Sequence, residues 1–377
     1  MRYIWAHIAA ITNQYDGSLP LAHYLKQYYR QQPRLGSRDR RAISEMVYAW
    51  YRCSKGFAGN DLTLQQQVYA CLQQCGSLER VPQVLFAGEP LPEATFDIAG
   101  IFPFDMPPSV GITREAWLRS MLVQPDVFIR IRKDRRKAEA ALRDAGITYS
   151  IITDTCMTIP NGTSIEDVLP ADSYVVQDAS SQATGRFFNA KKGERWLDSC
   201  SGAGGKSLLL KDREPGVALT VTDKRDSILH NLKQRFKLYH HTLPEALVMD
   251  ATNSEQVRQT FGQRRFDHII CDAPCSGSGT WARTPEQLYF FSPALGNQYS
   301  NWQQSIGSNV ATLLAPGGTL IYITCSVFRQ ENEDVVQHIA ASQELSVEHM
   351  ELINGTGVKA DSMFVGVLRK KIPSGTL

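Results

Sequence analysis

Two cysteines and one aspartate stand where the side chains of a parallel sheet can do chemistry. Residues 266–272 read FDHIICD, a short apolar run typical of a strand buried on both faces, and the run stops at Asp272. Cys275 follows in a loop rich in glycine and serine, which suits close approach of a ligand to the backbone. A second apolar run, LIYITCS at 320–326, also reaches a cysteine, Cys325. Ligands bind at the carboxyl edge of open α/β sheets, so we expect these groups to lie together there.

A purely structural interpretation of these residues is also available. Asp272 can cap a turn, and Cys275 can be a small buried hydrophobe, as many free cysteines are. Packing, however, would scatter thiols along their strands, whereas these two thiols stand at the same end of two core strands. We therefore favour a chemical role for both. The second run is preceded by Ala-Pro-Gly-Gly at 315–318, which predicts a turn before that strand.

Acidic residues follow the strands of the carboxyl-terminal half. Beyond residues 177–182 the pattern alternates strand, turn and helix, which predicts a doubly wound, mostly parallel α/β sheet. The strands expected at 195–200, 217–222, 246–249 and 266–272 contain or precede four acids: Asp198, Asp223, Asp250 and Asp272. One acid alone could be a helix cap. Four in register favour a nucleoside-like cofactor lying across the sheet edge.

A glycine-rich turn, SGAGGK at 201–206, connects the first of these strands to a leucine-rich helix. Such a turn lets backbone amides and a helix N-terminus face a ligand. It is weak evidence by itself, because every nucleotide-binding fold has one. A phosphate-binding P-loop is excluded, because the glycine spacing of G-x-x-x-x-G-K-S is not met.

The amino-terminal half has a different pattern. Residues 1–80 show apolar residues at helical spacing, with Ser37 as a helix cap, and no strand-like alternation. A proline-rich connector follows, and then VFIRIR at 127–132 predicts a half-buried strand with a basic face. The basic residues gathered there are Arg130, Arg132, Lys133, Arg135, Arg136 and Lys137. With a helix ending at Gly146 and a strand at 149–152, this β-α-β piece is either a small RNA-contacting platform or a structural appendage with solvated charges.

Composition bounds the class of protein. The chain has 377 residues and a formal net charge of +2, so contact with a nucleic acid must depend on local clusters of basic residues. Eight cysteines in a long chain, two of them in strand-end loops, favour a reduced, cytoplasmic setting. We expect no metal, because neither Cys71 with Cys75 nor Cys271 with Cys275 has a second ligand pair nearby. We also expect no secretory signal and no membrane span, and a monomer.

Three motifs carry a resemblance to a known family. The stretches LDSCSGAGGKS, DAPCSGSGTWARTPE and ITCSVFRQENEDVV resemble the RNA cytosine-5 methyltransferases related to RsmB (Sun) and the NOP2/Sun proteins. The resemblance covers residues 177 to the end, where MFVGVLRK looks like the final strand. Residues 37–52 resemble more weakly the helical extension of RsmB-like members. The domains then expected are a helical domain at 1–85, a connector with the β-α-β RNA-binding region at 86–170, and a methyltransferase domain at 171–377.

The resemblance implies S-adenosylmethionine as methyl donor and assigns roles to named residues. The cofactor would lie against Asp272, with Asp223 on its ribose and Asp250 near its adenine. The loop that binds it would comprise Cys200, Ser201, Gly202, Ala203, Gly204, Gly205 and Lys206. The family usually has a proline where Ala203 stands and often an arginine where Ile228 stands, which puts the fine contacts of the cofactor in question.

The resemblance also separates the two thiols. Carbon 5 of cytosine is too poor a nucleophile to take a methyl group unaided, so a thiolate must first add to carbon 6. Cys325 matches the nucleophile, Cys275 matches the cysteine that assists release of the product, and Asp272 would hold the base and supply a proton. The substrate implied is ribosomal RNA, 16S-like, with rRNA methylation as the function. Transfer RNA is an alternative acceptor, and a non-catalytic RNA-binding assembly factor is a third possibility.

Overall fold

The computed structural model describes residues 2–88 and 93–372. Residues 89–92, within the predicted connector, lie outside the described residues. The chain divides into two compact units. The first comprises the residues up to Asp105 together with Thr113–Gln124 and Thr280–Pro293, and the second comprises the rest. Because each unit collects segments from distant parts of the chain, the three consecutive domains stay a prediction.

The first unit is helical, as the sequence predicts for the described part of residues 2–80. Its α-helices are α1 (Arg2–Gln14), α2 (Leu21–Arg30), α3 (Ser37–Cys53), α4 (Leu64–Gln74), α5 (Arg114–Met121) and α11 (Pro285–Phe290). The prediction that Ser37 caps a helix is wrong, because α3 already includes Ser37 and Gly36 takes the cap position. A side-chain cap is present instead at another helix of this unit. At the start of α4, the Thr63 side chain accepts a hydrogen bond from the backbone amide of Gln66.

The second unit is built on a seven-stranded sheet in the order β10-β11-β9-β8-β5-β6-β7. The strands are β5 (Arg195–Asp198), β6 (Ala218–Asp223), β7 (Glu245–Val248), β8 (Phe266–Asp272), β9 (Leu314–Thr324), β10 (Leu345–Ile353) and β11 (Met363–Lys370). The five neighbouring strands β9, β8, β5, β6 and β7 run parallel, and β11 runs antiparallel to both of its neighbours, β9 and β10. The predicted doubly wound, mostly parallel sheet is therefore confirmed, including MFVGVLRK as its last strand.

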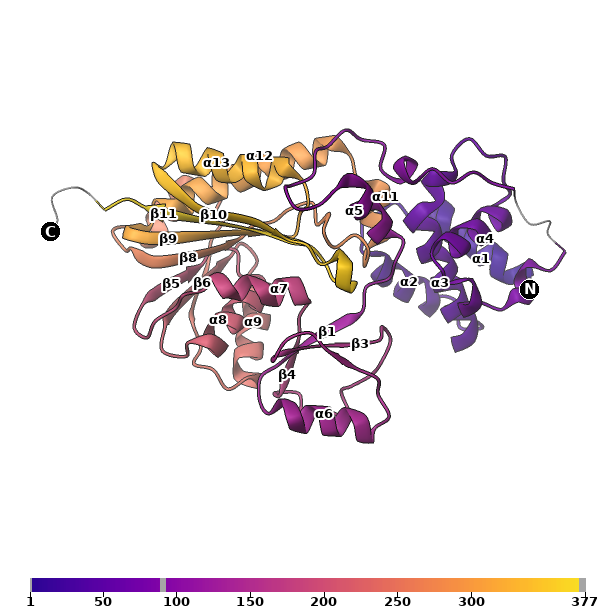
Figure 1. Cartoon of the computed structure of the whole chain (residues 1–377), viewed down its shortest axis with the longest axis horizontal. Coiled ribbons are helices and arrows are strands. Elements are labelled where there is room, and N and C mark those ends of the chain that lie inside the picture. The colour runs from indigo at the N-terminus through magenta and orange to yellow at the C-terminus, as the bar shows by residue number, and fades with distance from the viewer. Residues whose placement is uncertain (1, 89–92, 373–377) are drawn as a thin grey trace. The chain divides into compact units, whose positions relative to one another are not determined.

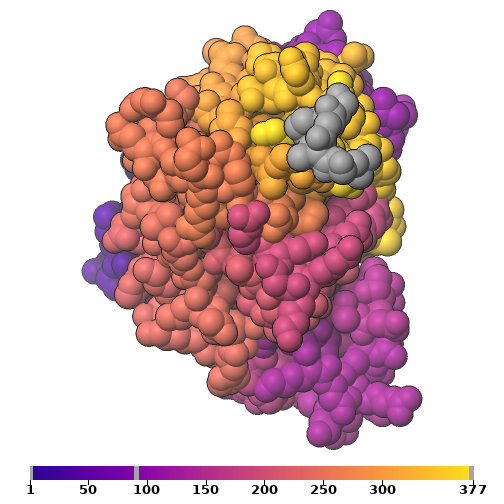
Figure 2. Space-filling view, turned by 90° about the vertical axis from the view of Figure 1, so that its left-hand side faces the viewer, coloured from indigo at the N-terminus to yellow at the C-terminus, as the bar shows by residue number. Residues whose placement is uncertain are grey.

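Helices cover both faces of this sheet. They are α8 (Gly205–Arg213), α9 (Asp226–Leu238), α10 (Ser254–Phe261), α12 (Pro293–Ala311) and α13 (Glu333–Ser342). Figure 1 shows α12 and α13 on one face and α8 and α9 on the other. Figure 2 shows another side of this unit, on which segments coloured rose, salmon, orange and yellow lie next to one another. No helix in the described ranges is both long and apolar enough to cross a bilayer.

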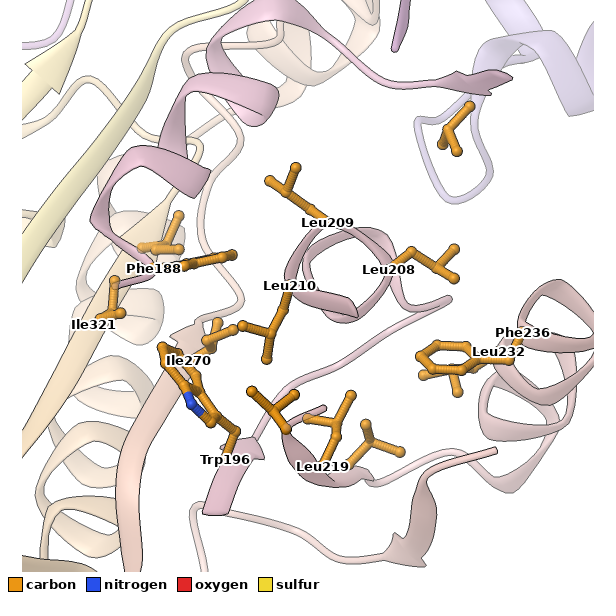
Figure 3. Packing of buried hydrophobic residues seen from close by; sticks show 14 of the residues in the cluster. Phe188, Trp196, Leu208, Leu209, Leu210, Leu219, Leu232, Phe236, Ile270 and Ile321 are labelled. Atoms are coloured by element: carbon orange, nitrogen blue, oxygen red, sulfur yellow. The ribbon is translucent and has the colours of Figure 1, made fainter. Parts of the chain in front are cut away.

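The core beneath α8 and α9 explains why this part folds as it does. Trp196 of β5 and Ile270 of β8 are fully buried, and Leu210 of α8 packs against them, as Figure 3 shows. On the other side of α8, Leu208 meets Leu232 of α9. Burying each such side chain stabilises the fold by about 1.5–3 kcal/mol. The leucine-rich helix predicted after the glycine turn is thus held against the sheet, which fixes the turn at its start.

The predicted turn at 315–318 is wrong. These residues lie inside β9, which begins at Leu314, and the pairing of β9 with β8 shifts register there. Gly317 has a φ of +75°, and a Cβ on Gly318 would lie 2.8 Å from the carbonyl oxygen of Asp267. Proline and glycine therefore make a bulge within a longer strand.

The small sheet belongs to the second unit and has the order β2-β3-β1-β4. Its elements are β1 (Val127–Ile131), α6 (Arg135–Asp144), β2 (Ser150–Ile151), β3 (Cys156–Ile159) and β4 (Tyr174–Val176), and α7 (Ala179–Ala183) follows. Neighbouring strands are antiparallel. The predicted β-α-β piece is present, with β3 inserted between β1 and β2.

The prediction that residues 127–132 form a basic, RNA-facing strand is wrong for Arg130, which lies in β1, and for Arg132, which follows it. The side chains of Arg130 and Arg132 are only 5% and 8% exposed, and both pair with Asp212 of α8. Arg132 also donates to the carbonyl oxygen of Tyr239 at 3.0 Å. A guanidinium held in this way is not available to a phosphate. The exposed basic residues of this region are on α6 and the turn before it.

Candidate active site

The carboxyl ends of the parallel strands gather the predicted acids at one edge of the large sheet. Asp223 ends β6, Asp272 ends β8, and Asp250 follows β7 by two residues. All three line one cavity of about 450 Å³, a volume in the range of small-molecule sites, about 300–1,000 Å³. Of the predicted loop, Cys200 and Gly202 also line it.

Asp198 departs from the pattern of four acids facing a ligand. It ends β5, but its side chain is fully buried beneath the glycine-rich loop and accepts a hydrogen bond from Ser207 Oγ at 2.6 Å. Burial raises the pKa of this carboxyl to about 7. Asp198 therefore supports the start of α8, and the prediction that it faces a cofactor is wrong.

Hydrogen bonds hold the glycine-rich loop in place. Gly202 and Gly204 have φ values of +50° and +83°, in the left-handed region that favours glycine. A Cβ on Gly204 would lie 2.9 Å from Leu232 Cγ, so a side chain there would push α9 away. Ser201 Oγ donates to the carbonyl oxygen of Thr222 at 3.1 Å. The carbonyl oxygen of Ala203 accepts from Arg235 Nη1 at 2.7 Å.

Asp223 is fixed at the cavity edge by its own neighbours. Its Oδ2 accepts from the amide of Gly202 at 3.1 Å, and its Oδ1 accepts from the amide and Nε of Arg225 at 3.0 and 3.1 Å. The Arg225 side chain is largely exposed, whereas Asp223 is buried. The carboxylate thus reaches the cavity in one fixed orientation. A fixed acceptor at the end of the second strand is what recognition of ribose hydroxyls requires.

Asp250 has two structural tasks at once. Its Oδ1 accepts from the amide and from Oγ1 of Thr252, at 2.9 and 2.7 Å, and these hydrogen bonds lower its pKa. It therefore caps the turn after β7 and also lines the cavity. Asn309 of α12 donates to the carbonyl oxygens of Ala251 and Thr252, at 3.0 and 3.1 Å. The turn and α12 are consequently held together.

An aromatic and aliphatic wall completes the cavity, and the sequence did not predict it. Tyr299, Trp302 and Ile306 of α12 line the cavity, together with Met249. Lys224 Nζ lies 5.7 Å from the centroid of the Trp302 ring. The three α12 residues recur at spacings of three and four, so the sequence does place them on one helix face. What it does not show is that this face meets the strand ends.

The two predicted thiols meet. Cys275 Sγ and Cys325 Sγ are 3.2 Å apart, and both cysteines are free. A disulfide would need about 2.0 Å. Close backbone packing positions Cys325, because Gly279 N donates to its carbonyl oxygen at 2.9 Å and a Cβ on Gly279 would lie 2.1 Å from the carbonyl oxygen of Ser362. Pro274, the neighbour of Cys275, lines the cavity.

Lys206 faces Asp272. Its Nζ lies 3.2 Å from Asp272 Oδ2 and 2.9 Å from Ser181 Oγ, and only 6% of its side chain is exposed. Lys206, Ser201, Ala203, Gly204 and Gly205 are not among the residues that line the cavity in the described part of the chain. Ser201, Ala203, Gly204 and Gly205 therefore influence the cavity only through the course of the loop backbone. Lys206 instead forms an ion pair with Asp272, the acid that ends β8.

The described residues contain no group of three or more His, Cys, Asp or Glu side chains that could hold a metal ion. The acids, the thiol pair and the hydrophobic wall instead fit an organic cofactor next to a nucleophile.

Comparison with known proteins identifies relatives of the second unit. Residues 186–373 match the family model described as 16S rRNA methyltransferase RsmB/F. The chain is 33% identical over 182 residues to the probable ribosomal RNA small subunit methyltransferase B of Bacillus subtilis, covering 46% of this chain and 39% of that protein. It is 28% identical over 229 residues to the ribosomal RNA small subunit methyltransferase B of Salmonella paratyphi A, covering 57% and 51%. The chain thus spans about half or less of these relatives' length.

Solved structures agree on the fold. The crystal structure of PH0851 has a TM-score of 0.69 at 17% identity, covering 92% of this chain and 93% of that one. The structure of NSun6 from Pyrococcus horikoshii with SFG has a TM-score of 0.58 at 14% identity, covering 68% and 94%. At such low identity these likenesses show the fold alone.

Proposed function

Residues 186–373 belong to the RsmB/F family of 16S rRNA methyltransferases, and from this premise we propose that the chain transfers a methyl group from S-adenosylmethionine to carbon 5 of a cytosine in ribosomal RNA. One observation carries the choice of cytosine C5. Two free thiols lie 3.2 Å apart, next to the cavity-lining residues Asp272 and Pro274. Other methyl acceptors, such as an amine or a ribose hydroxyl, give a pair of thiols no task.

The chemistry explains the need for a thiol. Carbon 5 of cytosine becomes nucleophilic enough only after a thiolate has added to carbon 6, which makes a covalent adduct with the enzyme. After methylation, the proton on carbon 5 must leave before the thiol can depart. A second thiol in contact with the first is well placed to assist that release. The two cysteines therefore divide the work between attack and release.

The surroundings of the thiols support Cys325 as the attacking group. Contact with Cys325, burial and the nearby charge of Glu331 raise the pKa of Cys275 well above its ordinary value. A raised pKa disfavours the thiolate of Cys275, which is the form that would attack carbon 6. Release needs a base that takes the proton from carbon 5; the carbon 5–carbon 6 double bond then re-forms and the Cys325 sulfur leaves as a thiolate, which can take a proton from the Cys275 thiol 3.2 Å away. The raised pKa of Cys275 agrees with the role that the family motifs imply for it.

Asp272 would hold the target base. It lines the cavity, its side chain is 31% exposed, and it lies next to the strand end that carries Cys325. A carboxyl group at this point can bond the amino and N3 edge of cytosine and supply a proton as charge develops there. Lys206 orients the carboxyl through their 3.2 Å contact. We therefore assign Lys206 to the base-binding side of the site.

The cavity fits S-adenosylmethionine, the cofactor of this family. Gly202 and its loop would hold the methionine portion, Asp223 the ribose, and Asp250 the adenine, with Met249 and Trp302 against the ring. The Gly202 Cα has open space around it, since an added Cβ would meet no atom within 4 Å. When bound, the cofactor supplies an electrophilic methyl group on its sulfonium. The protein's part is to orient that methyl group toward the base.

The RNA must present its cytosine outside a helix, because carbon 5 and carbon 6 of a stacked, paired base cannot reach two thiols. The family points to the small-subunit ribosomal RNA. The test is purified protein incubated with labelled S-adenosylmethionine and total RNA, followed by bisulfite sequencing. We expect label in small-subunit ribosomal RNA at one cytosine. Label confined to transfer RNA would replace the substrate, and label on a base other than cytosine would refute the reaction.

Cysteine variants test whether the label depends on the thiols of the proposed site. Cys325→Ala should abolish the label, because the variant lacks the thiol that adds to carbon 6. Cys156→Ala is the matched control, since Cys156 is a buried cysteine of the small sheet. Its variant should methylate at the wild-type rate. Full activity in Cys325→Ala would contradict the assignment.

A further inference from the structure

Glu331 is a fully buried carboxylate in a short helix, η6 (Arg329–Glu331), just after the loop that carries Cys325. Its oxygens accept four hydrogen bonds. Oε1 accepts from Ser276 Oγ at 2.5 Å and from Ser326 Oγ at 2.7 Å. Oε2 accepts from the amide of Ser276 at 2.8 Å and from Gln303 Nε2 at 2.9 Å.

The donors belong to the two cysteine loops. Ser276 directly follows Cys275, and Ser326 directly follows Cys325. A single carboxylate therefore binds the residue after each thiol, and one of its oxygens is shared between the two loops. This arrangement bridges segments that are 50 residues apart in sequence.

Further hydrogen bonds close the bridge on both sides. Gln303 Nε2 also donates to the carbonyl oxygen of Pro274 at 2.9 Å, so Cys275 is held from its preceding as well as its following residue. Asn332 Nδ2 donates to the carbonyl oxygen of Ser326 at 2.8 Å. The hydroxyls of Ser278 and Ser326 are 3.1 Å apart. The network leaves each loop little freedom to move away from the other.

Packing alone does not explain a carboxylate here. Burying a charge is costly, and apolar residues of similar size often fill such a position with equal or better stability. Serine hydroxyls could equally bond to each other. What a carboxylate provides is four acceptor positions that gather donors from several loops, together with a fixed negative charge.

We propose that Glu331 is a positioning residue that holds the two cysteine loops together so that both thiols meet at one point. Its role in catalysis rests on the function proposed above, whereas its effect on the thiols does not. Glu331 has a second effect through its charge, which contributes to the raised pKa of Cys275. The titratable groups that interact with Cys275 are Cys325, Glu331, Tyr299 and Tyr322. Among these, Glu331 is the carboxylate.

The spacing of the thiols can be measured with phenylarsine oxide, which bridges two adjacent thiols with release of water. Mass spectrometry of the digested protein locates the bridge. We expect the wild type to be bridged at Cys275 and Cys325, and Glu331→Gln to bind the reagent there about tenfold more weakly, because the variant lacks the hydrogen bonds to a charged group. Cys53 and Cys75, whose sulfurs are 3.9 Å apart, are an internal reference, and any reaction there should be the same in both proteins.

Two milder variants and one control separate position from charge. Ser276→Ala and Ser326→Ala each remove one hydrogen bond of the bridge and keep the charge, so each should weaken bridging by the reagent less than Glu331→Gln does. Glu333→Gln is the matched control, because Glu333 bonds Ser109 and Val110 instead of a cysteine loop. It should react as the wild type. If Glu331→Gln fails to fold, the two serine variants still test the proposal.

The pH dependence of alkylation by iodoacetamide reports the charge effect. Removal of the negative charge in Glu331→Gln should lower the pKa of Cys275, so its alkylation at a given pH should be faster than in the wild type. Ser276→Ala should leave that pH profile in place. Wild-type bridging in a folded Glu331→Gln protein, or no bridging in the wild type, would overturn the positioning role.

These thiol measurements need neither RNA nor cofactor. If the wild type transfers no methyl group but Glu331→Gln loses bridging, the proposed function fails and the role of Glu331 stands. If the wild type transfers methyl groups and Glu331→Gln is bridged as well as the wild type, the proposed function stands and the role of Glu331 fails. We also expect Glu331→Gln to lower kcat with little change in the KM for S-adenosylmethionine, since Glu331 is not among the cavity-lining residues in the described part of the chain. A rise in that KM with unchanged kcat would contradict the proposal.

Discussion

The edge of the large sheet and strand β1 of the small sheet both carry charged side chains in the second unit, but with opposite outcomes. At the large sheet, Asp223, Asp250 and Asp272 reach a cavity. Arg130 of β1 and Arg132, which follows β1, pair with Asp212, and their side chains are buried. The charge pattern of a strand therefore does not distinguish a binding surface from an internal ion-pair network. What distinguishes the two is whether the charged groups line a cavity or are paired with one another.

The network around Asp212 is closed. Burial alone would raise the pKa of this carboxyl, but hydrogen bonds from His241 and Arg132 and the charge of Arg130 bring it well below its ordinary value. His241 Nε2 lies 2.7 Å from Asp212 Oδ1. Such a network connects the small sheet to α8. We therefore expect that removal of the Asp212 network lowers stability, whereas removal of the cavity acids lowers activity.

The largest effect should come from Asp272→Asn. Methyl transfer should fall by about 10²–10⁴, because the asparagine cannot supply a proton to the base. Folding should change little, since the amide oxygen can still accept from Lys206. The measurement is the initial rate with labelled S-adenosylmethionine, together with a thermal melt. Asp267→Asn is the control at the amino end of the same strand, where Asp267 pairs with Arg195, and it should retain activity.

Asp212→Ala should show the opposite profile. Two guanidinium groups would remain buried without their carboxylate, which lowers the free energy of unfolding by about 3–5 kcal/mol. Methyl transfer, assayed well below the melting temperature, should persist. Denaturant unfolding followed by circular dichroism tests this. Asp172→Ala, which removes a partner of the exposed Lys133 and His240, should have a much smaller effect. Equal losses of stability in the two variants would remove the distinction.

Asp198→Asn should change how stability depends on pH. Since the pKa of Asp198 is raised to about 7, the folded protein binds a proton that the unfolded chain, with a value near 3.8, has released. This group therefore makes the protein less stable as pH rises from about 4 to about 7, by at most about 4 kcal/mol. The asparagine variant lacks this effect, so the difference from wild type should grow over that pH window. A constant difference would show that Asp198 is ionised throughout.

The smallest effect concerns the exposed basic residues of α6. Arg136→Ala with Lys137→Ala should reduce the salt dependence of RNA affinity, by about one unit of slope for each phosphate that the side chains no longer neutralise. Filter binding over a range of salt concentrations measures this slope. An unchanged slope would remove α6 from the RNA-binding surface and leave the small sheet as a structural appendage.

The sequence predicts best those elements whose signal is local. Strand β8 is expected at 266–272 and has those bounds, because an apolar run is ended there by an acid. Strand β9 is expected to begin after residue 318, but it begins at Leu314. Proline and glycine are turn formers in isolation, yet pairing with β8 accommodates them in a bulge. Whether these residues form a turn or a bulge therefore depends on pairing with the neighbouring strand, which the local sequence does not show.

The site is predictable where strand ends define it. Two strand ends suffice to predict that Cys275, Cys325 and Asp272 gather at one edge of the sheet. The two sulfurs are 3.2 Å apart, and Asp272 ends β8 at the cavity. The wall formed by Trp302 and its neighbours is not predictable in this way, because a helix pattern does not say which element its apolar face meets. Glu331 lies in the polar stretch RQENEDVV, where nothing in the residue types separates a buried acid from exposed ones.

The most direct test of the account follows the covalent adduct. Labelled substrate RNA is incubated with S-adenosylmethionine and each cysteine variant, and the products are run on a denaturing gel. Cys275→Ala should accumulate an RNA–protein complex that survives denaturation, because attack proceeds and release does not, and Cys325→Ala should give none. A stable complex with Cys325→Ala and none with Cys275→Ala would contradict the assignment of the two thiols.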